Sequence, residues 1–176
     1  MRIVIAGGGT GGHLFPAMAV REVLCARRPD ARVLFVGAAH GVEAGVLSRR
    51  GYDFRGLAAT PVSGKGFRGR LRAALGLSGT VREALAILRE FQPAAVLGMG
   101  GYASVPTMVA AALRRVPRVI HEQNAIPGLA NRWLGRLAHQ VAVSFADSAR
   151  FFPAGRVAVT GNPVRADMRP GAAGAA

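Results

Sequence analysis

The stretch RIVIAGGGTGGHLFPAMAV, residues 2–20, sets the start of the fold. Residues 2–6 form a short apolar run with β-branched side chains, which is typical of a buried strand. Five glycines and one threonine occupy residues 7–12, and residues 14–27 then place apolar side chains at helical spacing. The stretch therefore predicts a strand, a glycine turn and a helix in direct succession.

The same alternation continues along the chain. Further strand-like segments cover residues 32–37, 52–57, 94–98, 117–122, 140–145 and 156–161. Helix-like segments between them cover residues 81–91, 104–113 and 129–137. Continuously apolar strands that alternate with helices predict an α/β domain, a Rossmann-like doubly wound parallel sheet, over residues 1–165. Residues 166–176 are low in complexity and are expected to be a linker or a truncated tail.

Composition limits the classes of partner. The chain carries 23 Lys and Arg against 9 Asp and Glu, a formal charge of +14, which attracts phosphates, nucleic acid or acidic lipid. An arginine-rich proteome explains such a balance equally well. Nucleic-acid binding is disfavoured because the basic stretches lack interleaved stacking aromatics. The single cysteine, Cys25, fits a reducing compartment, and no apolar run approaches the roughly 18 residues of a membrane span.

Each unusual motif follows the end of a strand, where doubly wound sheets bind ligands. The glycine turn exposes backbone N–H groups at a helix N-terminus, which favours an anion, and five glycines exceed what close packing alone requires. His13 follows at once; the helix dipole keeps its ring neutral, as a general base requires. A capping or packing role for His13 is the alternative.

Three further motifs repeat this placement. Residues 98–104, GMGGYAS, offer a second concave run of N–H donors. Residues 121–124, HEQN, are four polar side chains directly after a strand, so they face a cleft or solvent. Residues 161–165, GNPVR, end the last strand, and Arg165 could reach a phosphate. A solvated loop and an ordinary turn are the alternatives for the last two motifs.

A dinucleotide site is the main competing interpretation. Gly7, Gly9 and Gly12 satisfy G-x-G-x-x-G, but that motif requires an acidic residue after the second strand to hold the ribose. No carboxylate follows residue 37 directly, and Glu43 comes too late in the sequence. A non-catalytic Rossmann module that binds a dinucleotide therefore ranks second. No metal or other cofactor is expected, because the chain has neither a Cys/His cluster of ligand spacing nor an Asp-x-Asp pair.

Four stretches together resemble the MurG family of bacterial glycosyltransferases. They are GGTGGHLFPAMAV at residues 8–20, VLGMGGYASVP at 96–106, HEQNAIPGLANRWL at 121–134 and GNPVR at 161–165. The resemblance implies the N-terminal, acceptor-side half of a GT-B fold, with the C-terminal donor domain absent and this chain inactive alone. It also implies inverting transfer of N-acetylglucosamine from UDP-N-acetylglucosamine to the C4 hydroxyl of lipid I, giving lipid II for peptidoglycan and cell-wall synthesis.

The resemblance also assigns site residues. It implies that His13 is the general base, with Glu122 as a second catalytic residue. The residues expected at the UDP-N-acetylglucosamine site are Thr10, Gly11, Gly12, Asn124 and Arg165. Those expected at the acceptor diphosphate are Gly100, Gly101, Tyr102, His121 and Gln123.

A lipid-linked acceptor cannot leave the bilayer, so the family places the enzyme in the cytoplasm, peripheral on the inner face of the bacterial membrane. Residues 63–77 are the candidate docking segment for an anionic surface, because cations and apolar side chains alternate there. The docking residues are Lys65, Phe67, Arg68, Arg70, Leu71, Arg72 and Leu75. A solvated loop before a core helix is the alternative, which Gly66, Gly69 and Gly76 favour by weakening a helix.

Overall fold

The computed structural model describes residues 1–8, 11–59 and 67–165, and in this part of the chain seven parallel strands form one sheet in the order β3-β2-β1-β4-β5-β6-β7. The strands are β1 (Arg2–Gly7), β2 (Arg32–Ala38), β3 (Phe54–Leu57), β4 (Ala95–Gly100), β5 (Arg118–Glu122), β6 (Gln140–Val143) and β7 (Val157–Val159). The predicted doubly wound α/β sheet is therefore confirmed, with each strand inside or within two residues of its expected segment.

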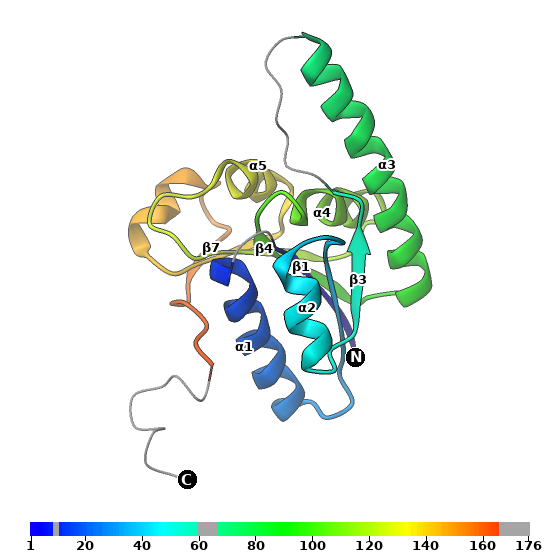
Figure 1. The fold of residues 1–176 in the computed structure, drawn as a ribbon. Coiled ribbons are helices and arrows are strands. Elements are labelled where there is room, and N and C mark those ends of the chain that lie inside the picture. Colours follow the sequence, from blue (N-terminus) through cyan, green and yellow to red (C-terminus); the bar gives the residue numbers. More distant parts are fainter. Residues whose placement is uncertain (9–10, 60–66, 166–176) are drawn as a thin grey trace.

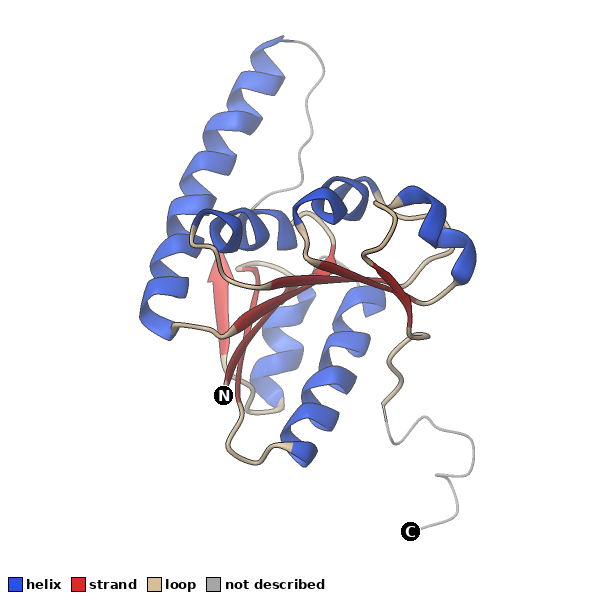
Figure 2. Ribbon diagram, turned by 180° about the vertical axis from the view of Figure 1, so that it is seen from behind, coloured by secondary structure: helices blue, strands red, loops and turns tan. Residues whose placement is uncertain are grey.

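Helices cover both faces of the sheet (Figures 1 and 2). The helices are α1 (Gly11–Arg27), α2 (Val42–Arg49), α3 (Phe67–Phe91), α4 (Ser104–Leu113), α5 (Leu129–Leu137) and the 3-10 helix η1 (Ala146–Phe151). Two buried clusters follow from this layering: α1 and α2 pack on one face, and α3, α4 and α5 pack on the other. Successive β1 side chains alternate between the two clusters: Val4 packs with α3, α4 and α5, and Ile5 packs with α1 and α2.

Two helices differ from the expectation. The segment that forms α2 was not predicted, because its eight residues carry little apolar periodicity and include Gly45. Helix α3 was expected over residues 81–91 but starts at Phe67, so the glycines at 76 and 79 do not interrupt it. The C-terminal half of α3 packs on the sheet through Ala84 and Leu88, and its N-terminal half projects beyond the domain body (Figure 1).

The position of the site follows from the strand order. Strand β1 lies between β2 and β4, so the chain first builds outward to β3 and then crosses back to continue on the other side of β1. The paired register of β1 and β4 ends at Gly7 and Gly100, each the last residue of its strand. The two glycine-rich segments therefore leave neighbouring strands side by side at the reversal, where such sheets bind ligands. Within the described residues, no helix has the length and apolar character needed to cross a membrane.

Alanine substitutions at two helical glycines, Gly79 in α3 and Gly135 in α5, test how these helices pack. A Cβ at Gly79 would meet nothing within 4 Å, whereas one at Gly135 would stand 2.5 Å from Cδ1 of Phe152. We expect Gly79→Ala to raise the free energy of unfolding by about 1 kcal/mol through helix propensity. Gly135→Ala should lower it by about 1–3 kcal/mol, because buried Phe152 must move. Urea denaturation checks both changes, and equal shifts would contradict the packing of α5.

Candidate functional site

The two glycine loops are in direct backbone contact. Gly100 and Gly101 have φ values of 99° and 75°, in the left-handed region that favours glycine. A Cβ at Gly101 would stand 2.2 Å from the carbonyl oxygen of Gly8, so a side chain there is excluded. The Ser104 hydroxyl donates to the Gly101 carbonyl at 2.8 Å and anchors the loop to the start of α4. The loops after β1 and β4 thus form a single backbone surface.

His13 lies against this surface. Its carbons Cε1 and Cδ2, which flank Nε2, lie 3.1 and 3.3 Å from where a Cβ would stand at Gly100 and Gly101. Its Nδ1 is 3.1 Å from Oε1 of Gln123. The ring is half-buried, in the first turns of α1, and its Nε2 edge is turned toward the second glycine loop.

Gln123 determines which nitrogen of His13 carries the proton. The amide nitrogen of Gln123 donates to the carbonyl of Met99 at 3.1 Å and to that of His121 at 3.3 Å. These two acceptors assign the amide oxygen to His13, so Nδ1 of His13 must be the donor. In the neutral ring the lone pair is then on Nε2. The arrangement can accept a proton at Nε2, on the edge that faces Gly100 and Gly101.

A buried carboxylate organises the HEQN motif. Glu122 is 1% exposed, and its Oε1 accepts hydrogen bonds from the backbone N–H of Asn124 at 2.9 Å and from the Asn124 side chain at 3.0 Å. Its Oε2 accepts from the side-chain amide of Asn131 at 2.9 Å. The Asn131 amide also donates to the carbonyl of His121 at 3.1 Å, so α5 is tied to the end of β5.

Sequence reasoning missed Asn131. The signal was available, because Asn131 precedes Leu134 by three residues and so lies on the buried stripe of α5, where an apolar residue is expected. A polar side chain at such a position needs partners, and here they come from the HEQN segment.

His121 ties β5 to the segment after β7. It is 3% exposed, and its Nε2 lies 3.1 Å from the carbonyl oxygen of Gly161; since a carbonyl only accepts, Nε2 carries the proton. Burial lowers the pKa of His121, an effect that the Gly161 carbonyl and the Glu122 carboxylate oppose. His121 is therefore largely enclosed by its own domain.

The remaining predicted site residues differ in their exposure and in their position relative to the glycine loops. Gly11 and Gly12 are exposed at the start of α1, Tyr102 is half-buried in the turn before α4, and Asn124 is exposed two residues after β5. Arg165 follows residues 162–164, which line an open groove of about 370 Å³ with Ala19, Val20 and Val23 of α1. That segment runs along the middle of α1 and away from the glycine loops (Figure 1). Thr10 lies outside the described residues.

Glu43 corrects one inference drawn from spacing. Its distance along the sequence excludes it from a ribose site by spacing alone, but the turn over residues 39–41 folds the start of α2 back, and Oε1 of Glu43 accepts the backbone N–H of Ala38 at 3.1 Å. A carboxylate therefore does lie at the end of β2. It is 1% exposed and packs beneath the loop, so it is not presented to a ribose.

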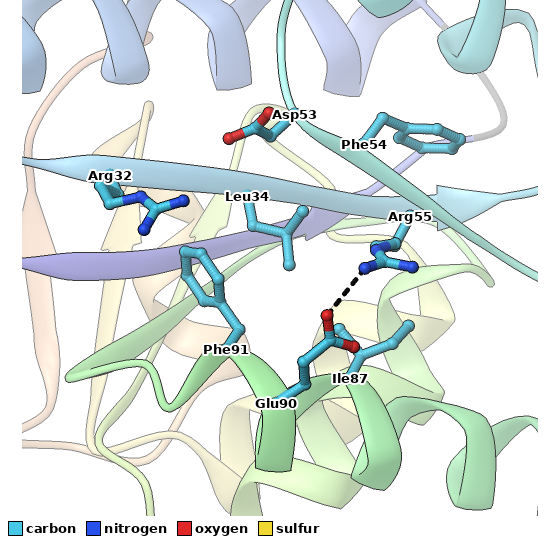
Figure 3. Close-up of a pocket in the computed structure, with 8 residues that line it drawn as sticks. All are labelled: Arg32, Leu34, Asp53, Phe54, Arg55, Ile87, Glu90 and Phe91. Carbon is cyan, nitrogen blue, oxygen red and sulfur yellow. Dashed lines mark hydrogen bonds and ion pairs between the residues drawn. The ribbon is translucent and has the colours of Figure 1, made fainter.

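A second hollow lies at the opposite end of the sheet. It measures about 230 Å³ and is bounded by the first residues of β2 and β3 and the last turn of α3 (Figure 3). Arg55 and Glu90 form an ion pair across it at 2.9 Å, and both side chains are exposed, so the pair contributes little stability. None of the predicted site residues lies there. Among the described residues, no three His, Cys, Asp or Glu side chains are grouped to hold a metal ion.

Comparison with known proteins gives the family. The glycosyltransferase family 28 N-terminal domain matches residues 3–143. The chain belongs to this family.

Bacterial relatives support the same assignment. The relative from Pelobacter propionicus is 47% identical over 165 residues, which cover 94% of this chain and 44% of that protein. The relative from Syntrophotalea carbinolica is 49% identical over 168 residues, which cover 96% of this chain and 47% of that protein. Both are named UDP-N-acetylglucosamine–N-acetylmuramyl-(pentapeptide) pyrophosphoryl-undecaprenol N-acetylglucosamine transferase. The chain spans about half the length of these relatives.

Solved structures also match this chain over about half of their own length. The crystal structure of Acinetobacter baumannii MurG superposes with a TM-score of 0.76 at 28% identity, over 96% of this chain and 47% of that one. The Neisseria meningitidis UDP-GlcNAc 2-epimerase, at 19% identity and a TM-score of 0.67, covers 92% of this chain and 46% of its own and shares the fold alone. The predicted N-terminal half of a GT-B glycosyltransferase is confirmed, and the dinucleotide module receives no support.

The buried His121 predicts a pH dependence of stability. Its lowered pKa means that the folded state binds fewer protons than the unfolded chain, whose histidines titrate near 6.5. Stability is therefore complete above about pH 6.5 and falls as the pH decreases below it, by up to about 1.4 kcal/mol per pH unit. In His121→Gln, which can still donate to Gly161, this part of the slope should disappear.

Urea denaturation between pH 5 and pH 8 measures the effect. Exposed His40 provides the control, because His40→Gln should keep the wild-type slope. A slope in His121→Gln equal to that of the wild type would contradict the assignment.

Proposed function

We propose that this chain is the acceptor-side half of an inverting glycosyltransferase that transfers N-acetylglucosamine from UDP-N-acetylglucosamine to the C4 hydroxyl of lipid I. The carrying observation is the His13–Gln123 contact, which leaves the Nε2 lone pair of the neutral ring beside the second glycine loop. The names of the bacterial relatives support the choice of donor and acceptor. The product is lipid II, the precursor of peptidoglycan.

The chemistry is a single displacement. Nε2 of His13 removes the proton from the C4 hydroxyl of the acceptor, whose oxygen attacks the anomeric carbon of the donor from the face opposite UDP. The new glycosidic bond forms as the bond from that carbon to the UDP oxygen breaks, so the configuration inverts. UDP leaves with the electron pair, and the proton remains on His13. Backbone N–H groups at the glycine loops stabilise the diphosphate charge.

The assigned residues divide between the two substrates. The nucleotide sugar is held on this half by Thr10, Gly11, Gly12, Asn124 and Arg165. The acceptor diphosphate is held by Gly100, Gly101 and Tyr102. His121 and Gln123, which the resemblance also assigns to the diphosphate, support this region instead, because Nε2 of His121 and the amide group of Gln123 already have partners within the domain. Glu122 contributes by fixing Asn124 through two hydrogen bonds, because both of its oxygens already have partners.

The acceptor requires a membrane surface, so we propose peripheral docking on the inner face of the bacterial membrane through residues 63–77. The continuous helix from Phe67 supports this, because it carries residues 67–77 of the segment on a projecting element (Figure 1). Lys65 lies outside the described residues, as do the side chains of Phe67, Arg68, Arg70, Leu71, Arg72 and Leu75.

Substitution of His13 tests the base. In the full-length two-domain transferase, His13→Ala should lower kcat by roughly 10²–10⁴ with the fold retained, since a general base contributes about that factor. Radiolabel transfer to lipid I measures kcat, and circular dichroism checks the fold. His40→Ala is the matched control and should leave kcat unchanged. An active His13→Ala enzyme would refute the base, and transfer by the 176-residue chain alone would refute its role as half of a site.

Vesicle sedimentation tests docking. A variant with Lys65, Arg68, Arg70 and Arg72 changed to glutamine should lose most of its binding to anionic vesicles, because each cation contributes about 1 kcal/mol near such a surface. Wild-type binding should weaken with salt.

The control carries the same change in charge elsewhere. It replaces four exposed arginines at the ends of α1 and α2, namely Arg27, Arg28, Arg49 and Arg50, by glutamine. Equal loss in the control would show that net charge, and not residues 63–77, determines binding.

A further inference from the structure

Glu43 is a charged side chain in the interior, and no step of the proposed reaction uses it. It lies in the first turn of α2 and is 1% exposed. A carboxylate is buried at a cost unless hydrogen-bond donors meet it, so its surroundings identify what it does there.

The Glu43 carboxylate accepts a backbone N–H group at the end of β2, beyond the residues of β2 that pair with β1. The N–H groups of Phe35 and Ala39 point toward β3, since they donate to the carbonyls of Asp53 and Leu57. Alternation along β2 therefore turns the N–H of Ala38 toward β1. The paired register of β1 and β2 ends at Ala6 and Val36, two residues before Ala38. Oε1 of Glu43 accepts the Ala38 N–H at 3.1 Å where the ladder would have continued.

The same carboxylate packs on the backbone of the first glycine loop. A Cβ at Gly8 would stand 2.0 Å from Oε1 of Glu43 and 2.6 Å from Cδ, and Gly8 has a φ of 147°. A Cβ at Gly41 would stand 2.3 Å from Cδ of Glu43. The absence of side chains at these two glycines is what admits the carboxylate, which fixes where the chain leaves β1.

This contact leads directly to the site. The carbonyl of Gly8 is the atom that meets Gly101 of the second glycine loop. Glu43 and His13 also line the same small cavity, of about 10 Å³, between the sheet and α1. A displacement of Gly8 would therefore move both the contact between the loops and the start of the helix that carries His13.

We propose that Glu43 is a positioning residue: it holds Gly8, and through it His13 and the second glycine loop, in the geometry of the transfer reaction. The inference rests on the proposed function for its effect on turnover. The contact with Ala38 and Gly8 is independent of that function and is measured separately.

The experiment compares Glu43→Ala and Glu43→Gln in the full-length transferase. Small displacements of reacting groups cost up to about 10²-fold in rate, so Glu43→Ala should lower kcat by about 10- to 100-fold, with a smaller change in KM. Glu43→Gln keeps an oxygen acceptor of the same shape and should recover most of kcat. Rescue by the neutral isostere distinguishes positioning from a need for the charge.

Glu83 is the matched control. Its carboxylate accepts the N–H of Ala58 just after β3, at 3.0 Å, so it has the same chemistry without contact with a glycine loop. Glu83→Ala should leave kcat within about twofold of the wild type, since it does not alter the geometry of the reacting groups. Amide hydrogen exchange of Ala38, measured on the same proteins, should accelerate at least about tenfold in Glu43→Ala and little in Glu43→Gln.

The outcomes separate the two proposals. Wild-type kcat in Glu43→Ala, or equal losses in the Ala and Gln variants, overturns the positioning role while the proposed function stands. If the wild type transfers no sugar, the proposed function fails instead. In that case the exchange of Ala38 decides the remaining claim: unchanged exchange in Glu43→Ala overturns it, and faster exchange supports Glu43 as the residue that fixes the loop.

Discussion

The approach of the Gly8 carbonyl to Gly101 is the constraint on which the rest of the site depends. No side chain fits at Gly101, because a Cβ would stand 2.2 Å from that oxygen. Two loops almost a hundred residues apart in sequence therefore share one backbone surface, and the parallel neighbours β1 and β4 deliver both to it. The ring of His13 lies against the second of these loops, so the position of this proposed base depends on glycine at positions where a side chain has no room.

Around this contact, side-chain amides and carboxylates determine orientation. Gln123 uses both hydrogens of its amide on carbonyls, which leaves only its oxygen for His13 and thereby selects the tautomer. Glu122 uses both oxygens to join Asn124 to Asn131. Networks of this kind are stronger in a buried environment, and this one fixes the orientation of the side chains proposed to take part in transfer. The polar HEQN segment thus has a structural role: it joins β5 to α5 and to the segment after β7.

The sequence predicts the strands and the first glycine loop, which depend on local pattern. It does not predict the side-chain contacts that arise when turns bring distant residues together. Apolar β-branched runs identify the strands, and glycine with histidine behind the first strand identifies the loop. Helix α2 has no comparable periodicity, and α3 continues through glycines that pattern alone treats as weak points. Glu43 was discounted by its distance along the sequence, although a three-residue turn brings it back to the end of β2. Asn131 lies on a helix, nine residues from its partner Glu122, and nothing local marks that pairing.

These contacts also indicate which substrate of the proposed transferase this domain positions. Among the described residues, Gln123 sets the tautomer of His13, and the second glycine loop lies against its ring. Arg165, assigned to the donor, follows a segment that runs along α1 and away from those loops. In the proposed reaction, we therefore expect the acceptor side to be formed before the donor is present, and the donor to depend on groups outside this domain for its orientation. Because positioning of two reactants supplies a large part of enzymatic rate, a preformed base without an oriented donor should bind without turning over.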